Sequence, residues 1–278
     1  ELGVVFTNAM LPDLAPREEI GRLSGSGWAF GYMGGVISLV IMLLFFAEGP
    51  GGKTLIGLAP AFGLDPARME GTRFVGPFTA LWYAVFMIPF FLWVREPRRP
   101  RAVSTRQAAA EAIPDLARTL KSLPERPSLL AFLLSSMLYR DALNGMYVFG
   151  GIYAAGVLGW PVQMTGIFGI LAALTGALFA WLGGRADARF GPKPVIVACV
   201  AVLALVALSI VFISREAVFG VEVAAGSRLP DIAFFALGAA IGAAGGSLQA
   251  ASRTMMVRQA DPNRMTEAFG LYALAGKA

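Results

Sequence analysis

Residues 128–158 form a long apolar stretch that carries two adjacent charged side chains, Arg140 and Asp141, near its middle. A charge at the centre of a bilayer costs about 2.5–3.5 kcal/mol on insertion scales. Such a side chain normally faces the interior of a helix bundle or a water-filled cavity. If the stretch spans a membrane, the pair points to a pathway for something polar.

Helical geometry separates the two charges. Adjacent residues of a helix point about 100° apart, so Arg140 and Asp141 cannot simply neutralise each other. Each requires its own partner. Arg140 could hold an anionic or carboxylate substrate with its planar guanidinium, or it could snorkel toward the membrane surface or bond a backbone carbonyl. Asn144, one turn after Arg140, and Gln249 in a later apolar stretch are expected to line a cavity or to join neighbouring helices.

The composition predicts an integral membrane protein with an all-α fold. The 278 residues are 56% hydrophobic and 15% charged, whereas soluble domains average roughly 45–50% and 25%. The 33 glycines suit close packing of transmembrane helices. The sequence has no histidine and one cysteine, Cys199, which excludes His-ligated metal sites, histidine proton relays and an internal disulfide framework. No cofactor is expected.

Runs of about 20 apolar residues are long enough to cross ~30 Å of hydrocarbon. Partial runs open and close the chain, at 1–14 and 267–278, so we expect an internal piece of a longer protein. Gly31, Gly34 and Gly35 in the first full run are expected to pack closely against a neighbour. The full runs fall at about 27–47, 74–94, 129–157, 164–183, 194–213 and 231–251.

Lys and Arg residues are distributed unevenly between the connections. One alternating set carries 16 of them and the opposite set carries 5. The positive-inside rule makes the first set cytoplasmic. The net charge of +5 is thus explained by topology, and no nucleic-acid partner is expected. The basic set comprises 15–26, 95–127, 184–193 and 252–266.

Residues 95–127 form the one substantial linker and divide the chain into 1–94 and 128–278. The linker begins with a basic, proline-broken stretch. Apolar residues between Ile113 and Leu123 then share one helical face. We expect an amphipathic helix on the cytoplasmic surface or against the ends of the bundle, and its simplest role is a tether between two bundles.

The segment 183–193 resembles the short-loop motif of the major facilitator superfamily, roughly G-x-x-x-D-R-x-G-x-K. Glycines permit a tight reversal, the Asp can cap a neighbouring helix, and the basic residues anchor at the headgroups. The spacing from the Asp to the second Gly is one residue longer than in the motif, and an alanine replaces an expected acidic residue. A plain basic turn would explain the Arg and Lys but not the Gly-Asp-Gly framing. The residues that carry the motif are Gly184, Asp187, Arg189, Gly191 and Lys193.

Residues 7–35, 139–144 and 245–277 resemble the Atg22-like branch of that superfamily, also called the UMF1 family. The match at 139–144 departs from the family pattern at Arg140, where a small or amide side chain is usual. The resemblance implies a twelve-helix transporter in two pseudo-symmetric halves. This chain would hold the end of helix four through the start of helix eleven. Fungal relatives are associated with amino-acid efflux from the vacuole, so the resemblance implies a small-molecule substrate.

The resemblance also suggests how the charges are used. Helices seven and eleven adjoin in the superfamily, and Asp141 and Lys277 lie at similar depths in them. We hypothesise a mid-membrane ion pair that breaks and remakes as access alternates; a static structural bridge is the alternative. Arg253 and Glu267, at cytoplasmic helix ends, would latch the two halves together or merely anchor at the surface.

The function expected is secondary active transport of small polar solutes such as amino acids by alternating access, with export as a candidate direction. No G-x-x-x-x-G-K-[ST] loop is present, which argues against ATP coupling within the chain. Asp141 is the carboxylate that would carry a coupling proton. A membrane-embedded enzyme, or a non-transporting receptor or scaffold of the same fold, is the alternative. The lipid bilayer of a bacterial inner membrane is the expected location.

Overall fold

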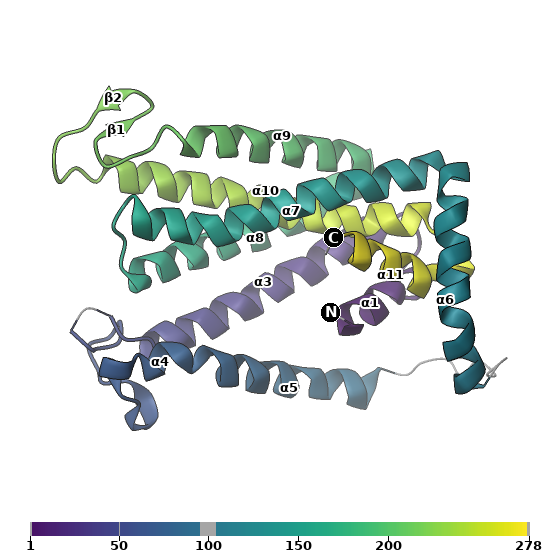
Figure 1. Ribbon diagram of the computed structural model, residues 1–278, viewed down its shortest axis with the longest axis horizontal. Coiled ribbons are helices and arrows are strands. Elements are labelled where there is room, and N and C mark those ends of the chain that lie inside the picture. Colours follow the sequence, from purple (N-terminus) through teal and green to yellow (C-terminus); the bar gives the residue numbers. More distant parts are fainter. Residues whose placement is uncertain (1, 50, 95–103, 277–278) are drawn as a thin grey trace.

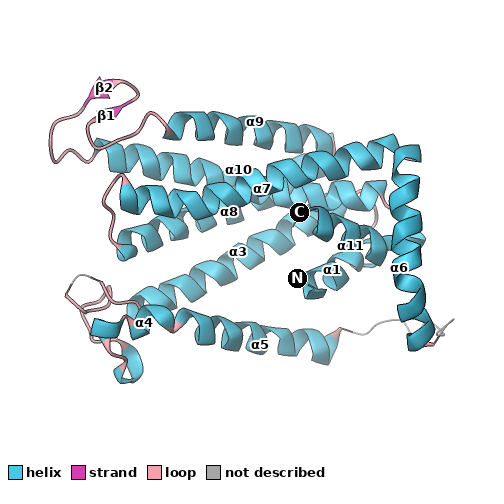
Figure 2. Ribbon diagram, viewed as in Figure 1, coloured by secondary structure: helices cyan, strands magenta, loops and turns pink. Residues whose placement is uncertain are grey.

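The computed structural model describes residues 2–49, 51–94 and 104–276, and these are almost entirely helical (Figure 2). The basic stretch 95–101 and Lys277 lie outside the described residues. The N-terminal part contains α1 (Leu2–Ala9), α2 (Leu11–Leu14), α3 (Ile20–Phe45), α4 (Glu70–Arg73) and α5 (Val75–Trp93). The linker helix is α6 (Thr105–Ser122), and the C-terminal part contains α7 (Pro127–Gly156), α8 (Val162–Phe190), α9 (Pro192–Ile210), α10 (Leu229–Gln259) and α11 (Met265–Ala275).

Five helical segments within the described residues are long and apolar enough to cross a membrane: α3, Glu70–Trp93, α8, α9 and α10. The chain is therefore an integral membrane protein, and the all-α prediction is confirmed. The sixth expected span, α7, is a continuous helix of 30 residues but is not among the five. It carries Arg140, Asp141 and Asn144 at mid-length, and these polar residues lower its apolar character.

The helices run side by side along the long axis of the molecule, and α6 lies across one end of them (Figure 1). A small antiparallel hairpin, β1 (Ala217–Val218) and β2 (Val221–Glu222), lies at the opposite end. We call these the α6 end and the hairpin end. α6 begins earlier than its apolar face indicated, and Ile113, Leu116 and Leu120 of that face are exposed in the described chain.

The connection between α8 and α9 differs from the sequence prediction. α8 continues past the end expected near 183 to Phe190, and Pro192 already begins α9. The single residue between them, Gly191, has φ +86°, a conformation that glycine adopts at little cost. The prediction of a turn over 183–193 is therefore wrong. Gly184 lies inside the helix and serves packing rather than chain reversal.

α3 and α8 are antiparallel neighbours that approach through small residues. A Cβ placed on Gly25 would collide with the carbonyl of Ala180 and with the backbone of Gly184. Further along, the ring of Tyr32 covers Gly176. This contact joins the N-terminal part of the chain to the C-terminal part along nearly the full length of both helices.

The three glycines expected to pack closely, Gly31, Gly34 and Gly35, do not do so among the described residues. A Cβ at each of these positions would meet no atom within 4 Å. They lie on other faces of α3 than Gly21 and Gly25, which face α8. Within the described chain, the close glycine contacts of α3 are therefore made by Gly21 and Gly25 and not by the three expected positions.

The hairpin end of the C-terminal part is fixed by a polar clamp above an aromatic cluster. The indole N–H of the buried Trp160 donates to a carboxylate oxygen of Asp231 at 2.6 Å. Arg215 donates to the same carboxylate at 2.9 Å and to the carbonyl of Leu158 at 2.7 Å. Beneath them Trp160 packs edge-on against Phe234. The clamp ties the hairpin to the α7–α8 connection and to the start of α10.

Candidate functional site

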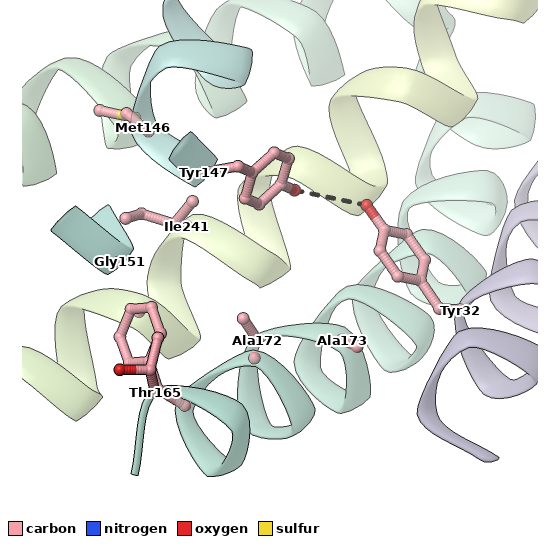
Figure 3. A pocket seen from close by; sticks show the side chains of 11 residues that line it. Tyr32, Met146, Tyr147, Gly151, Thr165, Ala172, Ala173 and Ile241 are labelled. Carbon is pink, nitrogen blue, oxygen red and sulfur yellow. Dashed lines mark hydrogen bonds between the residues drawn. The ribbon is translucent and has the colours of Figure 1, made fainter. Parts of the chain in front are cut away.

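A cavity of about 240 Å³ lies where α3, α7, α8 and α10 meet. Figure 3 shows Tyr32 and Tyr147 on one side of it, with Ala172, Ala173 and Thr165 along α8. None of the lining side chains is charged, and most are apolar or small. The full lining is Tyr32, Met146, Tyr147, Gly151, Thr165, Phe168, Gly169, Ala172, Ala173, Gly238 and Ile241.

Three polar side chains from three helices form a chain of hydrogen bonds at the edge of this cavity. The amide nitrogen of Gln249 on α10 donates to the hydroxyl of Tyr32 on α3 at 3.2 Å. The hydroxyls of Tyr32 and Tyr147 on α7 are 3.4 Å apart and point toward one another (Figure 3). These hydrogen bonds therefore link the N-terminal part of the protein to the C-terminal part across the cavity. Gln249 had been predicted as a lining or interhelical group, whereas Tyr32 had not been singled out, because its neighbours in sequence are small and apolar.

A second cavity, of about 470 Å³, continues from the first toward the hairpin end. It lies between α3 and α5 on one side and α7 and α8 on the other. The two cavities share Gly151, Thr165 and Gly169 as lining residues. The hollow space between the two parts of the chain thus extends from the tyrosine pair to the hairpin end.

Arg140 does not point to a free site, because it contacts α11. Its guanidinium donates to the carbonyl of Tyr272 at 2.6 Å and lies 4.2 Å from the centre of the Tyr272 ring. Among the roles that the sequence left open for Arg140, the bond to a backbone carbonyl is the one present in the structure. The same guanidinium also packs against Gly276.

Asp141 and Asn144 are exposed in the described part of the chain, and the side chain of neither forms a hydrogen bond or ion pair with another described residue. The proposed partner of Asp141, Lys277, lies outside the described residues. The Asp141–Lys277 pair therefore stays a prediction.

At the α6 end, Arg253 of α10 reaches across to the N-terminal part of the chain. Its guanidinium donates to the side-chain oxygen of Ser24 at 2.9 Å, to the Ser24 carbonyl at 2.6 Å and to the side-chain oxygen of Asn8 at 3.1 Å. It also lies 5.7 Å from the centre of the Trp28 ring. Ser24 in turn donates to the carbonyl of Ala250 at 2.8 Å. These contacts join α1 and α3 to α10.

One member of the short-loop motif, Asp187, is buried in the same region. Asp187 is only 1% exposed and lies 3.9 Å from the guanidinium of Arg258 on α10. Gly21 of α3 packs directly on the Asp187 side chain. Arg17 donates to the carbonyl of Arg258 at 3.3 Å. The carboxylate thus lies at a junction of α3, α8 and α10.

The other motif residues have separate surroundings. Gly184 packs against Gly25, and Gly191 ends α8. Arg189 is exposed, with its guanidinium 5.2 Å from the ring of Phe190, and Lys193 is exposed near the start of α9.

Glu267 does not meet Arg253. Its carboxylate forms an ion pair with Arg264 and accepts a hydrogen bond from the hydroxyl of Thr119 on α6. Arg264 also donates to the Thr119 hydroxyl at 3.2 Å. Glu267 therefore ties α11 to the linker helix. Of the two residues expected to form the latch, Arg253 is the one that bridges the two parts of the bundle.

The sequence profile described as "Vacuole effluxer Atg22 like" matches residues 9–278. The chain belongs to this family. Among the proteins that resemble it is an uncharacterized MFS-type transporter, YxiO, of Bacillus subtilis (strain 168). It is 22% identical over 277 residues, which are 98% of this chain and 57% of that protein.

Autophagy-related protein 22 of Coccidioides immitis (strain RS) is 24% identical over 213 residues, covering 71% of this chain and 34% of that protein. The chain thus spans little more than half the length of the first relative and about a third of the second. No solved structure matches it. The family and the helical architecture identify a membrane protein of the major facilitator type, and the names of both the family and the first relative indicate transporters rather than enzymes.

Proposed function

We propose that the chain forms part of a secondary active transporter that works by alternating access. The arrangement of the two cavities supports this proposal. The hollow space between the two parts of the chain extends to the hairpin end and stops at the Tyr32–Tyr147 pair. On the far side of that pair, Arg253 and Asp187 hold the α6 end together. This is the shape of a carrier open toward one side of the membrane and closed toward the other.

Arg253 is the proposed latch of the closed end. Hydrogen bonds from a charged donor contribute about 1.5–3 kcal/mol each, and Arg253 makes three across the junction. A substrate that favoured the opposite state would need to offset their loss. Asp187, with Gly184 at the same seam, would move with α8 as the latch releases, and Glu267 would couple α11 to the linker helix.

We assign the α6 end to the cytoplasm on the basis of the charge distribution. The connections at this end are the basic set, and positively charged connections are retained inside. The linker 95–127 would then be cytoplasmic in a bacterial inner membrane, and the cavities would open outward.

The proposed substrates are small polar solutes such as amino acids, and the direction is export. The family description names an effluxer, which supports the direction. Asp141, with Lys277 as its partner, would carry a coupling proton, because a carboxylate at mid-membrane depth is functional by default. Asn144 would line the same pathway.

The test is transport by the protein at its native length in sealed vesicles. Radiolabelled amino acids are offered with and without an imposed pH gradient, and Asp141→Asn and Lys277→Met are compared with the unaltered protein. We expect saturable uptake that depends on the gradient, and loss of that dependence in both variants. Unchanged coupling in the two variants would refute the ion-pair mechanism.

The same experiment separates the rival classes. Binding of a solute without its movement across the membrane would indicate a receptor or scaffold. Chemical conversion of the solute would indicate an enzyme.

A further inference from the structure

Glu48, directly after α3 at the hairpin end, is a buried carboxylate in the long connection to α5. Only 6% of the Glu48 residue is exposed to solvent. One carboxylate oxygen, Oε2, accepts a hydrogen bond from the backbone N–H of Thr72 at 3.0 Å. Gly71 packs its backbone directly on this oxygen and on the carbonyl of Phe46. The carboxylate is therefore held in a closed, tightly packed place rather than at a mobile loop tip.

The other oxygen, Oε1, is buried and has no hydrogen-bond partner among the described residues. No Lys or Arg of the described chain forms an ion pair with Glu48. Phe46 stacks on Phe74 at 4.7 Å beside it, so the surroundings are apolar. An ionised carboxylate in such a place is costly unless its charge is compensated.

Two hydroxyl groups of the same connection share this condition. The Oγ1 atoms of Thr72 and Thr54 are buried, and neither has a hydrogen-bond partner among the described residues. Thr72 is the residue whose amide already holds Glu48, so its hydroxyl belongs to the same corner of the structure. Thr54 is 3% exposed.

A partner for these oxygens must be small, because the atoms are already enclosed by the protein. We propose that Glu48 and Thr72 hold a monovalent metal cation of the sodium class. Carboxylate, hydroxyl and carbonyl oxygens are the ligands that hard cations prefer. A single positive charge neutralises the single carboxylate, whereas a divalent ion would leave an excess charge in an apolar environment.

The site lies beside a contact between the two parts of the chain. Gly49, the next residue, packs against the side-chain amide of Gln163 at the start of α8. Thr72 also lines the 470 Å³ cavity. A bound cation would fix this contact, and, if the proposed transport function holds, it would couple ion binding to the state of the hairpin end.

Cation binding can be measured without any substrate. The purified protein at its native length is unfolded thermally in NaCl, KCl, CaCl₂ or choline chloride at constant ionic strength. We expect a Tm that rises with NaCl concentration above its value in choline chloride, because an ion that binds only the folded state stabilises it. Glu48→Gln should abolish the rise, and Thr72→Val should weaken the apparent affinity by about tenfold or more. Glu222→Gln, an exposed carboxylate on the hairpin, is the matched control and should leave the rise unchanged.

Equal Tm values in NaCl and choline chloride, or a sodium-dependent rise that survives in Glu48→Gln, would overturn the proposal. Stabilisation by CaCl₂ alone would overturn the monovalent assignment. If Glu48→Gln does not fold, Thr72→Val decides the matter, since unchanged sodium affinity in that variant would also overturn the proposal. Failure of amino-acid transport with sodium binding intact would reject the transport proposal and leave the ion site standing.

Discussion

Gly25 of α3 and Gly184 of α8 lie backbone to backbone, and no side chain fits between them. The pair lies on the seam that joins the N-terminal part of the chain to the C-terminal part, close to the Arg253 latch. Close approach of this kind replaces the hydrophobic driving force that is missing between helices in lipid.

Gly25→Ala is expected to destabilise the protein by about 1–3 kcal/mol, because the added methyl group would overlap the Ala180 carbonyl and the Gly184 backbone. Thermal unfolding of the detergent-purified protein measures the effect. Gly34→Ala on the same helix is the control and should be nearly neutral, since a Cβ there meets no described atom within 4 Å. Equal losses in the two variants would contradict the assignment of the seam.

Arg253→Ala should loosen the α6 end. Three hydrogen bonds to Ser24 and Asn8 are lost, so backbone amides around Asn8 and at the start of α3 should exchange with deuterium faster. Arg253→Lys should rescue only in part, because an ammonium group lacks the planar fork. Arg189→Ala, which removes an exposed guanidinium, is the control. Unaltered exchange in Arg253→Ala would show that this residue is no latch.

Asp187 and Arg258 should respond unequally to removal. Arg258→Ala leaves a buried carboxylate without its cation and should cost about 3–5 kcal/mol. Asp187→Asn removes the buried charge, and the Arg258 side chain, 32% exposed, can still reach water, so the loss should be much smaller. Thermal unfolding of the two single variants and the double variant measures the difference. A larger loss in Asp187→Asn than in Arg258→Ala would contradict this account.

Tyr32→Phe should impair transport more than Tyr147→Phe. The first change removes both hydrogen bonds of the chain, including the 3.2 Å bond from Gln249, while the second removes only the 3.4 Å contact between hydroxyls. A loss of about 1–2 kcal/mol corresponds to a rise of roughly 5- to 30-fold in apparent KM. Uptake kinetics in vesicles measure it, with the exposed Tyr83→Phe as control. The reverse order of the two variants would mean that Tyr32 does not organise the cavity.

The polar residues show where sequence reasoning reaches its limit. The type and spacing of Arg140, Asp141 and Asn144 predicted two charges that face different ways on one helix, and the structure places Arg140 against Tyr272 while Asp141 is exposed. The short-loop motif singled out Asp187 as a candidate functional residue, but it did not indicate which residues surround the carboxylate. Its role depends on Gly21 and Arg258, which are far from it in sequence.

The amino-acid sequence by itself determined the apolar spans, the linker, the asymmetry of basic connections and membership of a transporter superfamily. The first three follow from composition and local periodicity, since each span must satisfy its own backbone hydrogen bonds in lipid. The membership rests on the resemblance of the motifs to those of the family. Only the tertiary structure decided which small residues form the seam, that Tyr32 and Tyr147 meet across a cavity, and that Glu48 is enclosed without a charged partner among the described residues. Such facts depend on the rotation of each helix about its axis and on contacts between residues more than a hundred positions apart, which no local pattern specifies.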